Sequence, residues 1–128
     1  MNVPHKMRVL LILGVIFIAA PFSMRAAAIP TYPASQAGLH VSEHAIIVGT
    51  LSKVEVFPKT GDILLHINGV WPDQQFFALI HAEHVSVFPD LRPFIGHALG
   101  FRGIILKGPS GDIKMHLQRF DQIIVPKP

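Results

Sequence analysis

Histidine is the most frequent residue in this chain that can bind metal or transfer protons, with eight in 128 residues. His81 and His84 are three residues apart, with Glu83 between them, and would lie on one side of a helical turn. Two imidazoles at this spacing can bind zinc or copper, which makes the pair a candidate metal site without an identified third ligand. The alternative is that the histidines are solvent-exposed and add positive charge below about pH 6.5.

A second string, His40-x-x-Glu43-His44, matches the H-x-x-E-H motif of inverzincin metallopeptidases. That mechanism needs the string on a helix, but here it joins a proline-containing segment to a strand pattern. The chain also lacks cysteine, a G-x-S-x-G element and a phosphate-binding glycine loop. We therefore expect no enzymatic activity and no cofactor.

Aromatic and basic residues indicate a different chemistry, the binding of an extended ligand. Trp71, His66 and one phenylalanine of the Phe76-Phe77 pair could stack on nucleobases, while basic side chains contact phosphates. The alternative is that the aromatic residues pack in the core and the lysines only solvate the surface. The residues predicted to bind a ligand are Lys53, Lys59, His66, Trp71, Phe76, Arg102, Lys107 and Lys114.

The first 28 residues have the pattern of an export signal. A basic start is followed by the 12-residue apolar run Val9 to Ala20 and by Ala26-Ala27-Ala28, an A-x-A cleavage site. The run is shorter than the roughly 20 apolar residues that span a membrane. We predict that residues 1–28 are a signal peptide and that the mature protein is periplasmic or secreted, without a membrane span.

Loss of this segment changes the meaning of the charge. Lys6, Arg8 and Arg25 account for the whole formal charge of +3, so the remainder is neutral. Residues 29–91 are then acidic and residues 92–128 basic. A neutral protein has little general attraction for a polyanion, and any binding to nucleic acid should be weak and sensitive to salt.

The elements that would position these residues are short strands. Residues 29–43 contain two prolines and little periodicity, which indicates a linker or mobile arm, and residues 44–126 should form the folded domain. The expected strands are residues 45–57, 62–68, 75–81, 97–107 and 113–125, the last with a break. Val85, Phe88, Leu91 and Ile95 recur at helical spacing between the third and fourth strands, where prolines limit helix length.

Two glycines and a change of phase indicate a curled sheet. Gly49 and Gly103 each lie between large apolar residues on one face of a strand, where glycine permits a bend or a close approach. The apolar phase of the first strand slips near Ser52-Lys53, which predicts a β-bulge.

The strand order, these glycine-centred strands, the motif Gly96-His97-Ala98-Leu99-Gly100-Phe101-Arg102-Gly103 and the closing Asp121-Gln122-Ile123-Ile124-Val125 resemble an OB-fold domain over residues 44–125. The chain is similar to small exported bacterial single-OB proteins and to anticodon-binding-type nucleic-acid domains. The resemblance implies a mainly β fold, a five-stranded Greek-key barrel of OB type with a short helix between strands three and four. It also implies ligand binding on strands two and three.

These observations predict a non-catalytic exported OB-fold binding module for single-stranded nucleic acid or another extended ligand. One alternative is an envelope protein-interaction module without a role in nucleic-acid binding. The other alternative is a histidine-based metal binder.

Overall fold

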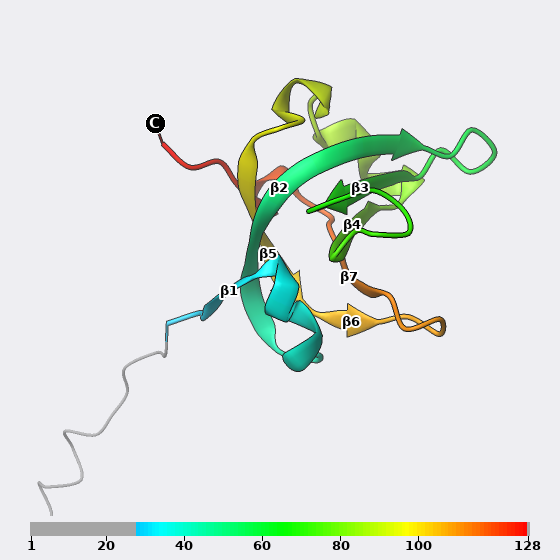
Figure 1. Cartoon of the computed structure of the whole chain (residues 1–128). Helices are drawn as coiled ribbons and strands as arrows, with labels where there is room; N and C mark the ends of the chain where they lie inside the picture. The colour runs from blue at the N-terminus through cyan, green and yellow to red at the C-terminus, as the bar shows by residue number, and fades with distance from the viewer. Residues whose placement is uncertain (1–27, 128) are drawn as a thin grey trace, which may run out of the picture.

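The computed structural model describes residues 28–127, which form a mainly β fold with short 3₁₀ helices (Figure 1). Its eight strands build one sheet that curls into an open half-barrel, in the order β6-β7-β4-β3-β2-β5-β8, with β1 beside β2. The strands are β1 (Thr31–Pro33), β2 (His44–Val56), β3 (Ile63–Ile67), β4 (Phe76–Ile80), β5 (Ala98–Ile104), β6 (Leu106–Lys107), β7 (Ile113–His116) and β8 (Ile123–Ile124).

The long strand β2 bends through the whole sheet, as Figure 1 shows. Residues 44–50 pair antiparallel with β5, and residues from Leu51 onward pair antiparallel with β3. The register shifts between Leu51 and Lys53, which confirms the bulge predicted from the apolar phase. One strand can therefore serve both halves of the curled sheet.

The hydrophobic core fills the inside of the curled sheet. Side chains alternate between the two faces along each strand, so every second residue points into this core. Leu65 and Ile67 of β3 and Phe76 and Ala78 of β4 are buried there. Gly49 permits close packing, because a Cβ at this position would lie 2.5 Å from Cγ2 of Ile67. The close approach expected at Gly49 is confirmed.

Eight strands are found where five were expected, partly because the last two expected strands divide. Residues 97–107 become β5 and β6, since the backbone of Ile105 hydrogen-bonds with Ser42 and Glu43. Residues 113–125 become β7 and β8, separated by a turn that contains the 3₁₀ helix η5 (Phe120–Gln122).

The helical segment between β4 and β5 consists of two 3₁₀ helices, η3 (Ala82–Val87) and η4 (Arg92–Phe94). Leu91 is buried, and Val85 and Phe88 pack against the core, as their spacing predicted. Ile95 is exposed, so its expected place on the apolar side is wrong. Pro93 limits the second helix to a short turn, and the helical periodicity does not extend through the segment.

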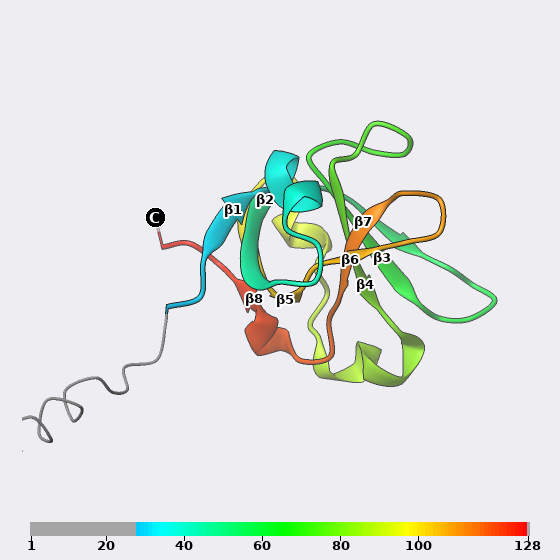
Figure 2. The same cartoon turned by 90° about the horizontal axis from the view of Figure 1, so that it is seen from below.

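The expectation that residues 29–43 form a linker or mobile arm is wrong. β1 pairs in parallel with β2, and the 3₁₀ helix η2 (Ala34–Leu39) lies beside β2 in Figure 2. Ala34 and Ala37 are buried in the core. Small side chains allow this close packing, which a reading of prolines and missing periodicity does not detect.

The predicted signal peptide lies outside the described residues, apart from Ala28. Within residues 28–127, no helix has the length and apolar character needed to cross a membrane.

Candidate ligand-binding face

The face of β2, β3, β4 and β7 that points away from the core carries a row of four directly paired residues. Lys53 pairs with His66, His66 with Phe77, and Phe77 with Lys114. Residues paired in this way lie on the same face of a sheet. Two lysines therefore flank an imidazole and a phenyl ring on this surface, which we call the outer face.

His66 is the centre of the row. Its side chain is 1% exposed, and its Nε2 lies 2.8 Å from Oε1 of Glu55. The Phe77 ring meets the imidazole edge-on, with ring centroids 5.1 Å apart. Nδ1 of His66 has no hydrogen-bond partner among the described residues. Glu55 and Phe77 thus hold the imidazole in one orientation, and its burial contradicts the prediction that His66 stacks on a nucleobase.

A hollow of about 410 Å³ lies over this part of the outer face. This volume is in the range of ordinary small-molecule sites, about 300–1,000 Å³. Its wall is mainly apolar, with one positive and one negative side chain. The lining residues are Lys53, Glu55, Phe57, Leu64, His66, Val70, Trp71 and Phe77.

Trp71 stands between this hollow and a second one. It is 68% exposed and lies in the loop between β3 and β4. The second hollow, of about 280 Å³, is lined by this loop and by the loop between β6 and β7, residues 108–112. The exposed indole of Trp71 therefore borders both hollows.

The assignment of Phe76 to the ligand-binding set is wrong. Phe76 is 1% exposed and packs in the core near Phe101, whereas Phe77 points to the outer face and lines the hollow, although only 7% of it is exposed. Adjacent residues of a strand point to opposite faces, so the choice between them depends on register. Register follows from the pairing of β4 with β3, which the local sequence Phe76-Phe77 does not determine.

The predicted basic residues do not form one cluster. Lys53 lines the hollow and Lys114 continues the row, whereas Lys59 is exposed in the turn between β2 and β3. Lys107 is exposed on the edge strand β6. Only Lys53 and Lys114 are therefore placed by pairing on the outer face beside His66 and Phe77.

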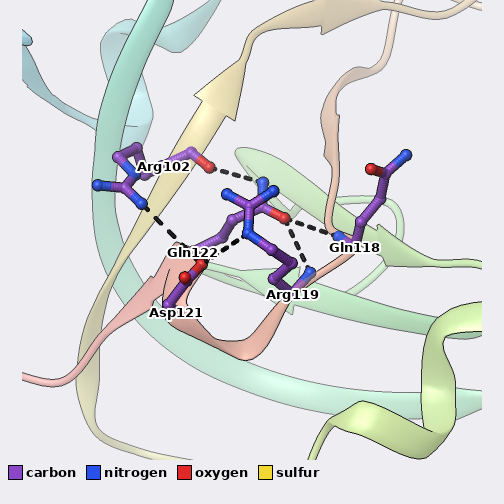
Figure 3. Close-up of polar contacts among 5 residues, drawn as sticks. All are labelled: Arg102, Gln118, Arg119, Asp121 and Gln122. Carbon is purple, nitrogen blue, oxygen red and sulfur yellow. Dashed lines mark hydrogen bonds and ion pairs between the residues drawn. The ribbon is translucent and has the colours of Figure 1, made fainter.

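Arg102 belongs to a different polar group, on the C-terminal side of the fold (Figure 3). Its guanidinium Nη2 lies 4.0 Å from Oδ1 of Asp121, and its carbonyl accepts a hydrogen bond of 2.9 Å from Nε2 of Gln122. Oε1 of Gln122 accepts hydrogen bonds from the backbone N–H groups of Gln118 and Arg119. This buried amide ties η5 to β5, a structural role that the sequence analysis did not detect.

The two candidate metal ligands contact different acidic residues. Nδ1 of His81 lies 3.9 Å from Oδ1 of Asp62, and Nε2 of His84 lies 3.9 Å from Oε1 of Glu83. Residues 28–127 contain no group of three or more histidine, aspartate or glutamate side chains arranged to hold a metal ion. A metal site at His81 and His84 thus gains no support from the fold.

The H-x-x-E-H string also lacks the helical geometry of a peptidase site. His40 follows a 3₁₀ helix and His44 begins β2. Nδ1 of His40 lies 2.7 Å from Oε2 of Glu43, and this hydrogen bond, followed by that from Tyr32, lowers the pKa of the Glu43 carboxyl. These residues fasten the N-terminal segment to the sheet.

Comparison with protein-family profiles and with curated protein sequences gave no match to this chain.

Proposed function

We propose that this protein is a non-catalytic binding module that takes a single-stranded nucleic acid on the outer face of β2, β3 and β4. The observation that carries the proposal is one hollow lined by Trp71, Phe77, His66 and Lys53. The largely exposed indole of Trp71 can stack on a base of any sequence and contribute about 1–3 kcal/mol by alanine substitution, while the buried rings of His66 and Phe77 support the hollow from the sheet. Lys114 supplies positive charge for a phosphate at the far end of the row, and Lys53 supplies positive charge in the hollow itself.

We further propose that the sheet is a five-stranded barrel of OB type formed by β2, β3, β4, β5 and β7. The pairing supports this interpretation, because β2 lies between β3 and β5, while β4 pairs in parallel with β7. β5 also contacts β7, and a Cβ at Gly103 would lie 2.9 Å from Sδ of Met115. OB-folds bind extended ligands on the surface of strands two and three, the positions of β3 and β4 here.

The N-terminal pattern supports export to the periplasm or the medium, with residues 1–28 as the signal peptide. The remaining chain is formally neutral, so attraction for phosphate depends on local lysines rather than on net charge. The expected affinity is weak and falls with salt.

A second candidate function, docking to another protein, is favoured by a separate apolar row. Val48 of β2, Gly100 of β5 and Ile124 of β8 are directly paired, and both large side chains are exposed. This row lies on β2, β5 and β8 rather than on the face with Trp71. These residues carry no charge, so the row is better suited to contact an apolar protein surface than the phosphate backbone of a nucleic acid.

Trp71 offers a direct test because it is the only tryptophan in the chain. Short single-stranded oligonucleotides should quench its fluorescence at about 50 mM salt, and the apparent affinity should fall at about 200 mM. Dye-labelled oligonucleotides should give the same affinity by anisotropy. If neither signal changes at low salt, nucleic-acid binding is excluded, and docking through Val48 and Ile124 becomes the leading function.

A further inference from the structure

An acidic side chain lies in the hollow that is proposed to receive a polyanion. Glu55 and Lys53 are two residues apart on β2, so both point to the outer face, with their Cα atoms about 7 Å apart. A carboxylate here would repel a phosphate. It is suited instead to a ligand group that donates hydrogen bonds.

The carboxylate is held in place but keeps free capacity. Oε1 of Glu55 lies 2.8 Å from Nε2 of His66, which is itself packed edge-on against Phe77. The second oxygen, Oε2, makes no hydrogen bond within residues 28–127. The side chain is about one-third exposed, so a ligand in the hollow can reach it.

We propose that this hollow prefers guanine, with Glu55 and Lys53 recognising its Watson–Crick edge. This inference rests on the proposed binding of single-stranded nucleic acid. Guanine presents a carbonyl acceptor, O6, beside two donors, N1–H and the 2-amino group. The Glu55 carboxylate accepts from the two donors, and the Lys53 ammonium donates to O6. The order of charges along β2 thus matches the order of donors and acceptors along the base.

The other bases match this pair less well. Thymine and uracil carry one donor, N3–H, between two carbonyl oxygens. One of these oxygens would face the Glu55 carboxylate and be repelled by it. Cytosine and adenine offer an amino group to Glu55 but lack the adjacent ring N–H donor. We therefore expect guanine to bind best, and thymine or uracil worst.

The apolar wall provides the stacking contact. Trp71 and Val70 come from the loop between β3 and β4, and Phe57 directly follows β2. A base whose edge meets Glu55 and Lys53 can place its face on the exposed indole of Trp71. Stacking supplies affinity for every base, and the polar pair supplies the preference.

The test uses the unmodified protein and oligothymidines of equal length that carry one central guanosine, inosine, cytidine or adenosine. A single central guanosine should raise affinity by about tenfold over the all-thymidine strand. Inosine should lose part of this gain, since it lacks the 2-amino group. Trp71 fluorescence and anisotropy report binding at one fixed salt concentration.

Glu55→Gln removes the charge while keeping the shape of the side chain. It should abolish the preference for guanosine, so that the guanosine strand binds no more tightly than the all-thymidine strand to the same variant. Glu83→Gln is the matched control, since Glu83 is exposed on η3 and does not line the hollow.

Equal binding of all five strands would overturn the guanine preference and leave the proposed function intact. A preference that survives in Glu55→Gln would remove Glu55 from recognition. Absence of binding by every strand would overturn both the preference and the nucleic-acid function. The inosine comparison needs no mutation, so the result does not depend on how well Glu55→Gln folds.

Discussion

The ring of Tyr32 lies flat on the imidazole of His40, with ring centroids 3.6 Å apart and planes inclined by 5°. The two residues flank η2, and both reach the same carboxylate: the Tyr32 hydroxyl donates to Oε1 of Glu43, and His40 Nδ1 lies 2.7 Å from Oε2. This stacked pair closes the N-terminal segment onto the start of β2.

Glu43 should make the stability of the fold sensitive to acid. Its pKa is lowered by the hydrogen bond with His40 and then by that from Tyr32. A carboxyl with a lowered pKa in the folded state stabilises the protein above its unfolded pKa, and this contribution is lost as pH falls through the folded pKa. The free energy of unfolding, measured with urea from about pH 7 to about pH 3, should decrease less steeply with falling pH in Glu43→Gln than in the wild type. An unchanged slope, equal to that of Glu83→Gln, would contradict this role.

His116 should add a second pH dependence. Its pKa is lowered mainly by burial and further by the charges of His81 and Lys114. The unfolded chain therefore binds this proton at a higher pH than the folded chain, so stability falls as pH drops through about 6.5. His116→Gln should reduce the difference in unfolding free energy between about pH 7.5 and 5.5. His44→Gln, which replaces an exposed histidine of β2, should retain the wild-type difference in unfolding free energy between these two pH values.

Gln122→Ala should destabilise the fold by about 3 kcal/mol, because it leaves several backbone groups without partners. The backbone groups that lose their hydrogen-bond partner are the N–H groups of Gln118 and Arg119 and the carbonyl of Arg102. Denaturant unfolding measures the change. Gln118→Ala is the matched control, since this exposed glutamine contributes its backbone to the group. Equal stability of the two variants would refute the role of the buried amide.

Trp71→Ala should weaken oligonucleotide binding by about 1–3 kcal/mol, the free energy of one stacked base. Trp71→Phe should recover part of the loss, because a smaller ring still stacks. Both variants should unfold close to the wild-type denaturant midpoint, since Trp71 is largely exposed. Labelled oligonucleotides measure the affinity. Leu39→Ala, at an exposed apolar residue on η2, should bind normally. Unaltered affinity of Trp71→Ala would remove the indole from the site.

Lys114→Ala should weaken binding to every sequence and lower the salt slope by about one, because its ammonium at the end of the paired row releases counterions when it meets a phosphate. Lys53→Ala should instead reduce the preference for guanosine, because its ammonium donates to O6 of the base. Arg102→Gln should have little effect, because Arg102 lies beside Asp121 on another part of the fold. Affinities measured at several salt concentrations give the slopes. If the salt dependence of the affinity falls only in Arg102→Gln, the phosphates contact β5 instead of the outer face.

The sequence alone predicted much of the strand pattern, because alternation and glycine are local properties. The phase slip at Ser52-Lys53 located the bulge, and Gly49 indicated a close approach. Local patterns did not predict the packing of Ala34 and Ala37, since small side chains show no periodic signal. The buried amide of Gln122 was also missed, because all of its partners are backbone groups, which residue types do not reveal, and one of them, the carbonyl of Arg102, comes from another strand.

For the candidate site, residue types determined which groups could take part, and the tertiary structure decided which of them meet. His66, Trp71 and Lys53 were predicted from their chemistry and line one hollow. Phe77 replaced Phe76 because strand register selects the outward residue of an adjacent pair. Arg102 was placed elsewhere, and Glu55 entered the site, because the bend of β2 and its pairing with β3 determine which side chains share a face.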